Sequence, residues 1–145
     1  MANSDFINTL NMVLANTYAL YLKSQNYHWH VKGPSFKPTH DLLESHYTEL
    51  AEAIDEIAER IVMLNGSACA NFSELNNKKT LSDGNSKFDA KAMLTELAND
   101  HEEVMNTINS ALSHAQEQND EVSIGLLVDR LSWHEKSRWM LSSSI

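Results

Sequence analysis

The sequence predicts a single all-α domain that spans residues 1–145 and is built from four long helices. Glycine and proline, which interrupt helices, are scarce, with four and two copies respectively. Apolar residues recur every three or four positions over most of the chain, which is the spacing of one helix face. The length is sufficient for one buried core, and no run of about 18 apolar residues indicates a membrane helix.

The first helix is predicted over about residues 4–32. Phe6, Leu10, Val13 and the apolar residues after them share one face of it. Gly33-Pro34 follows and marks its end, because proline cannot continue a helix and glycine favours a terminus.

The second helix has the strongest pattern. Its apolar residues alternate by three and four positions from Leu43 to Leu64. Pro38 is compatible with its first turn, and Asn65-Gly66 marks its end. This helix is therefore expected to be long and to bury one face.

A polar connection over residues 66–88 follows, in which Phe72-Ser73-Glu74-Leu75 is predicted as a short helix. Apolar spacing from Leu94 to Ala115 then predicts the third long helix. The fourth begins near Asp120, whose side chain suits an N-cap.

Two helices, a long connection and two further helices are the layout of a four-helix bundle with one crossover. The predicted fold class is therefore all-α, a ferritin-like four-helix bundle with a short helix in the long crossover between helices two and three. No internal repeat suggests another architecture.

The balance of charge is acidic, with a formal net charge of -9. Residues 1–22 contain no Lys or Arg, so no basic tail offsets this charge, and DNA binding is expected to be weak or absent. The N-terminus lacks the pattern of a secretory signal, and no membrane association is expected. Cys69 is the only cysteine, which excludes an intrachain disulfide. A cytoplasmic protein is expected.

Two pairs of potential metal ligands lie on the second helix. His40 and Glu44 are four residues apart, as are Asp55 and Glu59, so each pair lies on one helix face within reach of one ion. Imidazole together with carboxylate suits iron, and also zinc or manganese.

The two pairs are too far apart to share an ion within one chain. Glu44 and Asp55 are eleven residues apart, roughly 16 Å along a helix. A second copy packed antiparallel about a two-fold axis near residue 50 would bring Asp55 and Glu59 against the partner's His40 and Glu44. None of the seven histidines has Glu three residues before it, so the usual intrachain di-iron motif is missing. The pattern predicts a dimer with two equivalent sites.

Several motifs resemble the signature of the Dps family, the mini-ferritins named DNA-binding proteins from starved cells. They are His28-Trp29, Val31-Lys32-Gly33-Pro34, His40 with Glu44, Asp55 with Ala58-Glu59-Arg60-Ile61, His134-Glu135-Lys136 and Trp139-Met140-Leu141. The resemblance covers nearly the whole chain.

This resemblance implies a homo-oligomeric, dodecameric shell with a ferroxidase centre at each end of every two-fold interface. His28, His40 and Glu44 would come from one subunit, and Asp55 and Glu59 from its partner. The substrates implied are Fe(II) and hydrogen peroxide, and the Fe(III) product would be stored as mineral, which protects against oxidative damage. Iron is the metal expected, zinc is a possible competitor, and no haem is expected.

The resemblance also implies roles for three further residues. Trp29 would lie beside it and intercept stray one-electron oxidants. Asp120 and Asp129 resemble the acidic residues that line iron-entry pores, although Gly125 stands where a further carboxylate is often found. The alternative for the two aspartates is a helix cap and a solvated side chain. The remaining histidines are expected to be structural or on the surface; they are His30, His46, His101, His114 and His134.

Two alternative functions stay open on the sequence alone. One is a structural particle that compacts DNA, which the family name suggests and the acidic charge opposes. The other is a shell whose site holds zinc without redox chemistry, because zinc competes well for imidazole and carboxylate.

Overall fold

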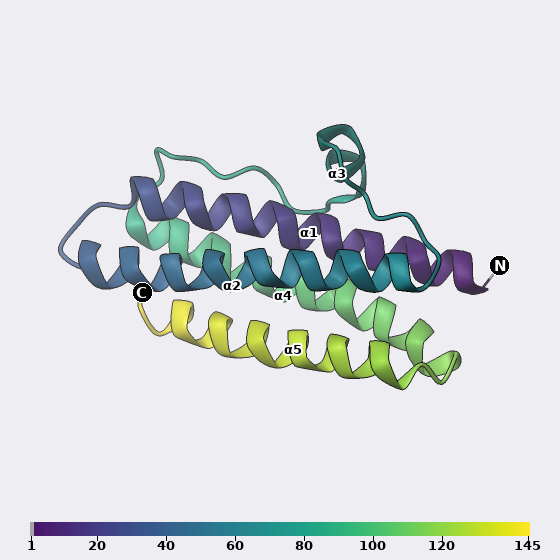
Figure 1. The fold of residues 1–145 in the computed structure, drawn as a ribbon. Coiled ribbons are helices and arrows are strands. Elements are labelled where there is room, and N and C mark those ends of the chain that lie inside the picture. Colours follow the sequence, from purple (N-terminus) through teal and green to yellow (C-terminus); the bar gives the residue numbers. More distant parts are fainter. Residues whose placement is uncertain (1) are drawn as a thin grey trace.

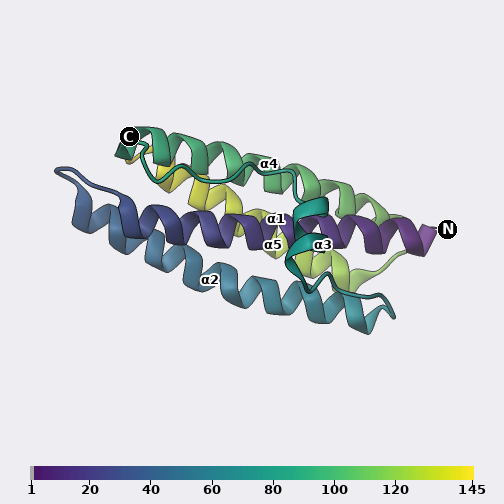
Figure 2. The ribbon, with the colours of Figure 1, turned by 90° about the horizontal axis from the view of Figure 1, so that it is seen from above.

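The computed structural model describes residues 2–145 and contains five helices. They are α1 (Ala2–His30), α2 (Phe36–Met63), α3 (Phe72–Lys78), α4 (Ala90–Glu117) and α5 (Glu121–Ser142). The four long helices lie alongside one another, and the crossover that contains the short α3 runs over α1 along the bundle (Figures 1 and 2). The predicted four-helix bundle with a short crossover helix is confirmed.

The ends of the helices follow from local chemistry. α1 ends at His30, two residues earlier than predicted, because the chain turns through Gly33, whose φ of 121° favours glycine. α2 begins at Phe36, so Pro38 lies in its first turn as predicted. Asp120 caps α5 by accepting a hydrogen bond from the Ser123 backbone N–H, which confirms the predicted cap.

The core lies between the inward faces of the long helices. Its largest fully buried side chains lie on α1, α2 and α4; they include Tyr27, Phe6, Leu10, Leu43, Leu50, Ile57, Met93, Leu97 and Ile108. The apolar faces predicted from the three-and-four spacing are the faces buried. No helix within residues 2–145 is long and apolar enough to cross a membrane.

Polar side chains of α1 hold the crossover against the bundle. The Asn16 amide donates to Thr80 Oγ1 at 2.9 Å, and its oxygen accepts from the Thr80 backbone N–H at 2.7 Å. The buried Lys23 ammonium donates to the Ser82 carbonyl at 2.9 Å and pairs with Asp100 of α4 at 2.7 Å. The crossover has few apolar residues of its own. Polar contacts with α1 therefore hold it in place, and Lys23 connects it to α4 as well.

We expect Asn16→Ala to lower the free energy of unfolding by about 1–3 kcal/mol, because the N–H groups of Thr80 and of the buried Leu81 would lose their acceptor. Urea denaturation at fixed protein concentration measures the change. Asn106→Ala, an exposed asparagine of α4, is the matched control and should change stability by less than about 0.5 kcal/mol. Equal stability of the two variants would show that the crossover is held by other contacts.

Candidate metal centre

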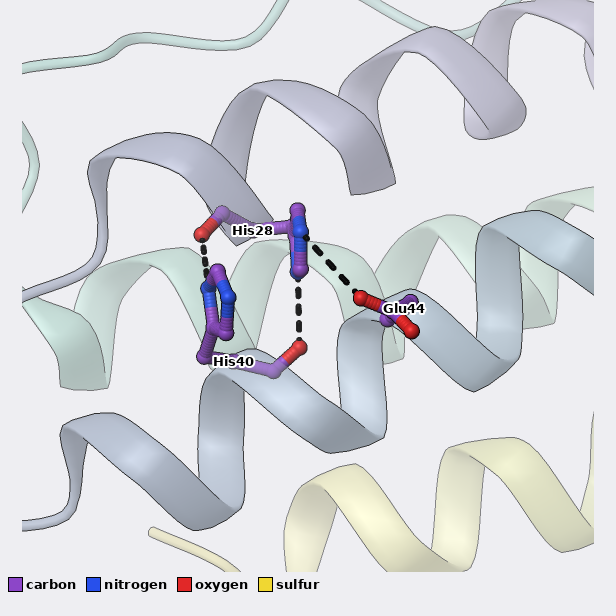
Figure 3. A group of neighbouring side chains, drawn as sticks. All are labelled: His28, His40 and Glu44. Atoms are coloured by element: carbon purple, nitrogen blue, oxygen red, sulfur yellow. Dashed lines mark hydrogen bonds and ion pairs between the residues drawn. The ribbon is translucent and has the colours of Figure 1, made fainter.

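The end of α1 and the start of α2 place two histidine rings face to face. The rings of His28 and His40 stack with centroids 3.7 Å apart at 14° (Figure 3). Gly33 permits the tight turn that brings these residues, twelve apart in sequence, together. The turn between helices therefore builds this part of the site.

Each of the two rings is fixed by the backbone of the other. His28 Nδ1 is 2.7 Å from the His40 carbonyl oxygen, and His40 Nδ1 is 2.7 Å from the His28 carbonyl oxygen. A carbonyl oxygen only accepts hydrogen bonds, so each Nδ1 must donate. In the neutral rings both Nε2 atoms then keep a free lone pair, which is the form that binds metals.

Glu44 supplies a carboxylate beside these rings. His28 Nε2 is 3.8 Å from Glu44 Oε1, too far for a hydrogen bond (Figure 3). Ligand atoms of His28, His40 and Glu44 all lie within 4.8 Å of one another. Two atoms that share an ion at about 2.0–2.2 Å lie roughly 3–4 Å apart, so the 3.8 Å between His28 Nε2 and Glu44 Oε1 suits a shared metal.

Aromatic rings pack around the two histidines. Phe36 stacks on His40 with centroids 4.9 Å apart, and Tyr47 meets the His28 ring edge-on at 5.2 Å. His28 is 5% exposed, whereas the Glu44 side chain is 59% exposed. The group therefore has a rigid buried side and an open side.

Asp55 and Glu59 do not belong to this group in the single chain. Both are exposed on α2, beyond Glu44 toward its C-terminus. The structure thus brings together three of the five predicted ligands, and the completion of the site by a second copy stays a prediction. Trp29, next to His28 on α1, has 59% of its surface exposed.

Asp120 is engaged within its own chain. Its carboxylate lies 2.9 and 3.0 Å from the Arg60 guanidinium and also accepts from the Ser123 hydroxyl. Burial opposes its charged form, but the hydrogen bonds from Ser123 and Arg60 outweigh this effect and hold the pKa of Asp120 below its ordinary value. Asp129 is exposed on α5, and a Cβ at Gly125 would meet no atom within 4 Å. The pore roles of Asp120 and Asp129 stay predictions.

A second histidine cluster, missed as a group by sequence reasoning, lies inside the bundle. His46, His101 and His134 come from α2, α4 and α5 and are 4%, 0% and 0% exposed. His101 Nδ1 lies 2.8 Å from His134 Nδ1, so one ring donates to the other. The only signal was that His101 falls within the apolar spacing of its helix.

The buried position of this cluster disfavours the protonated, positively charged form of its three histidines. Burial lowers the pKa of His46 to about 4 and the pKa values of His101 and His134 well below their ordinary value. Arg130 lies over the Trp133 ring at 4.9 Å and is paired with Glu49 at 2.6 Å. These histidines are therefore neutral parts of the core at pH 7.

Similarity to known proteins covers nearly the whole chain. A model of the ferritin-like domain matches residues 7–145. The DNA protection during starvation protein 2 of Bacillus anthracis is 34% identical over 96% of this chain and 95% of that protein. The crystal structure of a Dps protein from Bacillus brevis has a TM-score of 0.94 at 30% identity and covers 98% of this chain and 95% of the other. A Dps protein from Vibrio cholerae O1, described as a member of a broad superfamily of ferritin-like diiron-carboxylate proteins, has a TM-score of 0.93 at 29% identity, over 98% and 89% of the two chains.

Proposed function

Because the chain belongs to the Dps family of mini-ferritins in the ferritin-like superfamily, we propose that it oxidises Fe(II) at centres shared between two subunits. Hydrogen peroxide is the proposed oxidant, and the Fe(III) product is stored as mineral inside a dodecameric shell. The activity is that of a ferroxidase that limits oxidative damage.

The observation that carries this proposal is the reciprocal bonding of His28 and His40. It leaves both Nε2 atoms free of the backbone, and ligand atoms of the two histidines and of the exposed Glu44 carboxylate lie within 4.8 Å of one another. A site with two imidazoles and one carboxylate has room for further ligands around an iron ion. The carboxylates of Asp55 and Glu59 in a second subunit would supply them, because α2 packed about a two-fold axis near residue 50 aligns its two ends.

The chemistry follows from these ligands. Two Fe(II) ions each give one electron to hydrogen peroxide, whose O–O bond breaks, and two protons complete two water molecules. The carboxylates of Glu44, Asp55 and Glu59 favour the higher charge of Fe(III) over that of Fe(II), which makes loss of the electron easier. Trp29 would intercept one-electron oxidants that escape this reaction, and Asp120 and Asp129 would line the route of iron entry.

Hydrogen peroxide added to the anaerobic Fe(II)-loaded protein should produce the absorbance rise of Fe(III). Changing His28→Ala and Asp55→Ala together should slow this rise by at least about tenfold, since loss of the outer contacts of metal ligands alone costs about 10–100-fold. Stopped-flow absorbance measures the rate. Prior loading with Zn(II) should also slow it, because zinc competes for the same ligands.

His114→Ala is the matched control for these measurements, because His114 lies on α4 outside the group and should leave the rate unchanged. A parent protein that binds Zn(II) but gives no Fe(III) signal would support the non-redox zinc shell instead. An unchanged rate in the double variant would remove His28 and Asp55 from the site.

DNA retardation should be absent at low salt without magnesium. The relative from Bacillus anthracis is named for DNA protection, but each subunit here has a formal net charge of -9, which repels phosphate. Gel retardation with and without magnesium tests this expectation. A shift without magnesium would favour the DNA-compacting alternative, and a shift only with magnesium would indicate binding bridged by the cation.

A further inference from the structure

A row of three tyrosines leads from the metal centre to a surface groove. The ring of Tyr47 on α2 contacts the His28 ring edge-on, with centroids 5.2 Å apart. Tyr21 on α1 meets Tyr47 at 6.2 Å, and Tyr18, one helical turn away, meets Tyr21 at 6.0 Å. All three separations lie within the range of aromatic rings in direct packing. The row is therefore continuous from the ligand His28 to Tyr18.

The end of this row that lies away from the centre is its exposed end. Tyr47 and Tyr21 are half-buried, whereas Tyr18 is 38% exposed. Tyr18 and Tyr21 line a groove of about 650 Å³ between α1, α3 and the crossover. Gln25 donates a hydrogen bond to the Tyr21 hydroxyl at 3.2 Å, which fixes the middle ring. The row thus has one end at the candidate centre and the other in contact with solvent.

Resting on the proposed function, we propose that Tyr47, Tyr21 and Tyr18 form a relay that carries an oxidising equivalent from the metal centre to the groove beside α3. The relay acts when a centre holds one Fe(II) ion and peroxide needs a second electron. The phenol side chain is suited to this task, because it gives up one electron and one proton together.

The reaction balances with the substrates already named. Fe(II) gives one electron, Tyr47 gives one electron and its phenolic proton, and solvent gives one further proton. The O–O bond of hydrogen peroxide breaks, and two water molecules form. Tyr21 then returns an electron and a proton to the Tyr47 radical, and Tyr18 does the same for Tyr21. A small-molecule reductant, such as a thiol, restores Tyr18 by giving an electron and a proton in the groove.

The consequence is that hydroxyl radical is not released at the centre. The chain contains four tyrosines, and the fourth, Tyr27, lies off the row. It is buried on α1, and its hydroxyl contacts Glu96 and accepts from the Asn85 N–H at 3.0 Å. Tyr27 is therefore an internal control of the same residue type on the same helix.

The test uses the assembled protein with Trp29→Phe as the parent, so that the indole does not compete. Fewer than one Fe(II) ion per centre is added anaerobically, peroxide follows with a spin trap, and mass spectrometry of peptides locates the adducts. We expect adducts on Tyr18 in the parent, and also in the variant that carries Tyr27→Phe in addition to Trp29→Phe. The added Tyr21→Phe change should abolish the Tyr18 adduct and leave an adduct on Tyr47.

Undiminished labelling of Tyr18 after Tyr21→Phe would overturn the relay, because it would mean direct attack from solvent. A parent that oxidises Fe(II) but has no adduct on Tyr18 would overturn it too, while leaving the proposed function intact. If the parent oxidises no Fe(II), the result contradicts both the relay and the proposed ferroxidase function. Tyr47→Phe is a second variant for the case that Tyr21→Phe fails to assemble, and it should abolish the adducts on both Tyr21 and Tyr18.

Discussion

Mixing two inactive variants of this chain should restore about a quarter of the wild-type rate of Fe(II) oxidation, because each proposed centre takes ligands from both sides of an isologous interface. One variant carries His40→Ala and Glu44→Ala, and the other carries Asp55→Ala and Glu59→Ala. Random pairing makes about half of the two-fold dimers mixed. In each mixed dimer, one centre has all of its ligands, and the other centre lacks the ligands changed in both variants.

The expectation depends on α2 alone, since all four changes lie on that helix. The variants are unfolded and refolded together, and the initial rate with hydrogen peroxide is compared with that of each variant alone. Glu44, Asp55 and Glu59 are exposed in the single chain, so their removal should leave the bundle folded. Size-exclusion chromatography checks that the mixtures assemble.

A matched mixture separates a shared centre from an intrachain centre. One chain carries all four changes and is mixed with an equal amount of wild type. A shared centre then leaves only the wild-type dimers active, about a quarter of the total, whereas an intrachain centre would leave about half. Absence of recovery in the first mixture, with normal assembly, would exclude the proposed division of ligands.

Sequence spacing predicts the parts of this site that lie on one helix. On α2, His40 lies four residues before Glu44, and Asp55 lies four residues before Glu59, so periodicity alone forms each pair. His28 lies on the preceding helix, and only the family resemblance identified it. The reciprocal Nδ1 bonds that prepare both histidines for metal depend on how the turn through Gly33 closes, which no pattern of residues shows.

The long helices were predictable for a similar reason, and the buried histidine cluster was not. Apolar spacing defines each buried face without reference to other helices. His46, His101 and His134 are separated by 55 and 33 residues and meet only after three helices pack. Their contact is a property of the tertiary structure, so the sequence predicted them as separate structural or surface residues.

Acidification from pH 7 to pH 5 should lower the stability of the metal-free protein steeply, because these three histidines are neutral when buried. The unfolded chain binds protons below its ordinary histidine pKa of 6.5, while the folded chain resists them until the lowered pKa is reached. Stability is therefore fully present above pH 6.5 and falls as the pH drops. For His46 alone the loss is complete near pH 4 and amounts to about 3 kcal/mol.

The three histidines act together in this range. With the unfolded chain protonated and the folded chain neutral at all three positions, the slope approaches about 4 kcal/mol per pH unit. A folded domain has only about 5–15 kcal/mol of stability, so this contribution suffices to unfold it under mild acid. Urea denaturation at fixed protein concentration between pH 7 and pH 5 measures the slope.

Replacing His101 by Gln should lower the slope of the unfolding free energy against pH by about one third, because the unfolded chain then takes up two protons at these positions instead of three. This expectation holds whatever the variant does to stability at pH 7. His30→Gln is the control, since His30 is exposed on α1, and its slope should match that of the parent. Protonation of His101 or His134 would place a second cation near Arg130, whose charge is already neutralised by Glu49 at 2.6 Å. A slope that stays flat to pH 5 would mean that the cluster takes up protons while folded, which requires water or an anion to enter the bundle beside Trp133.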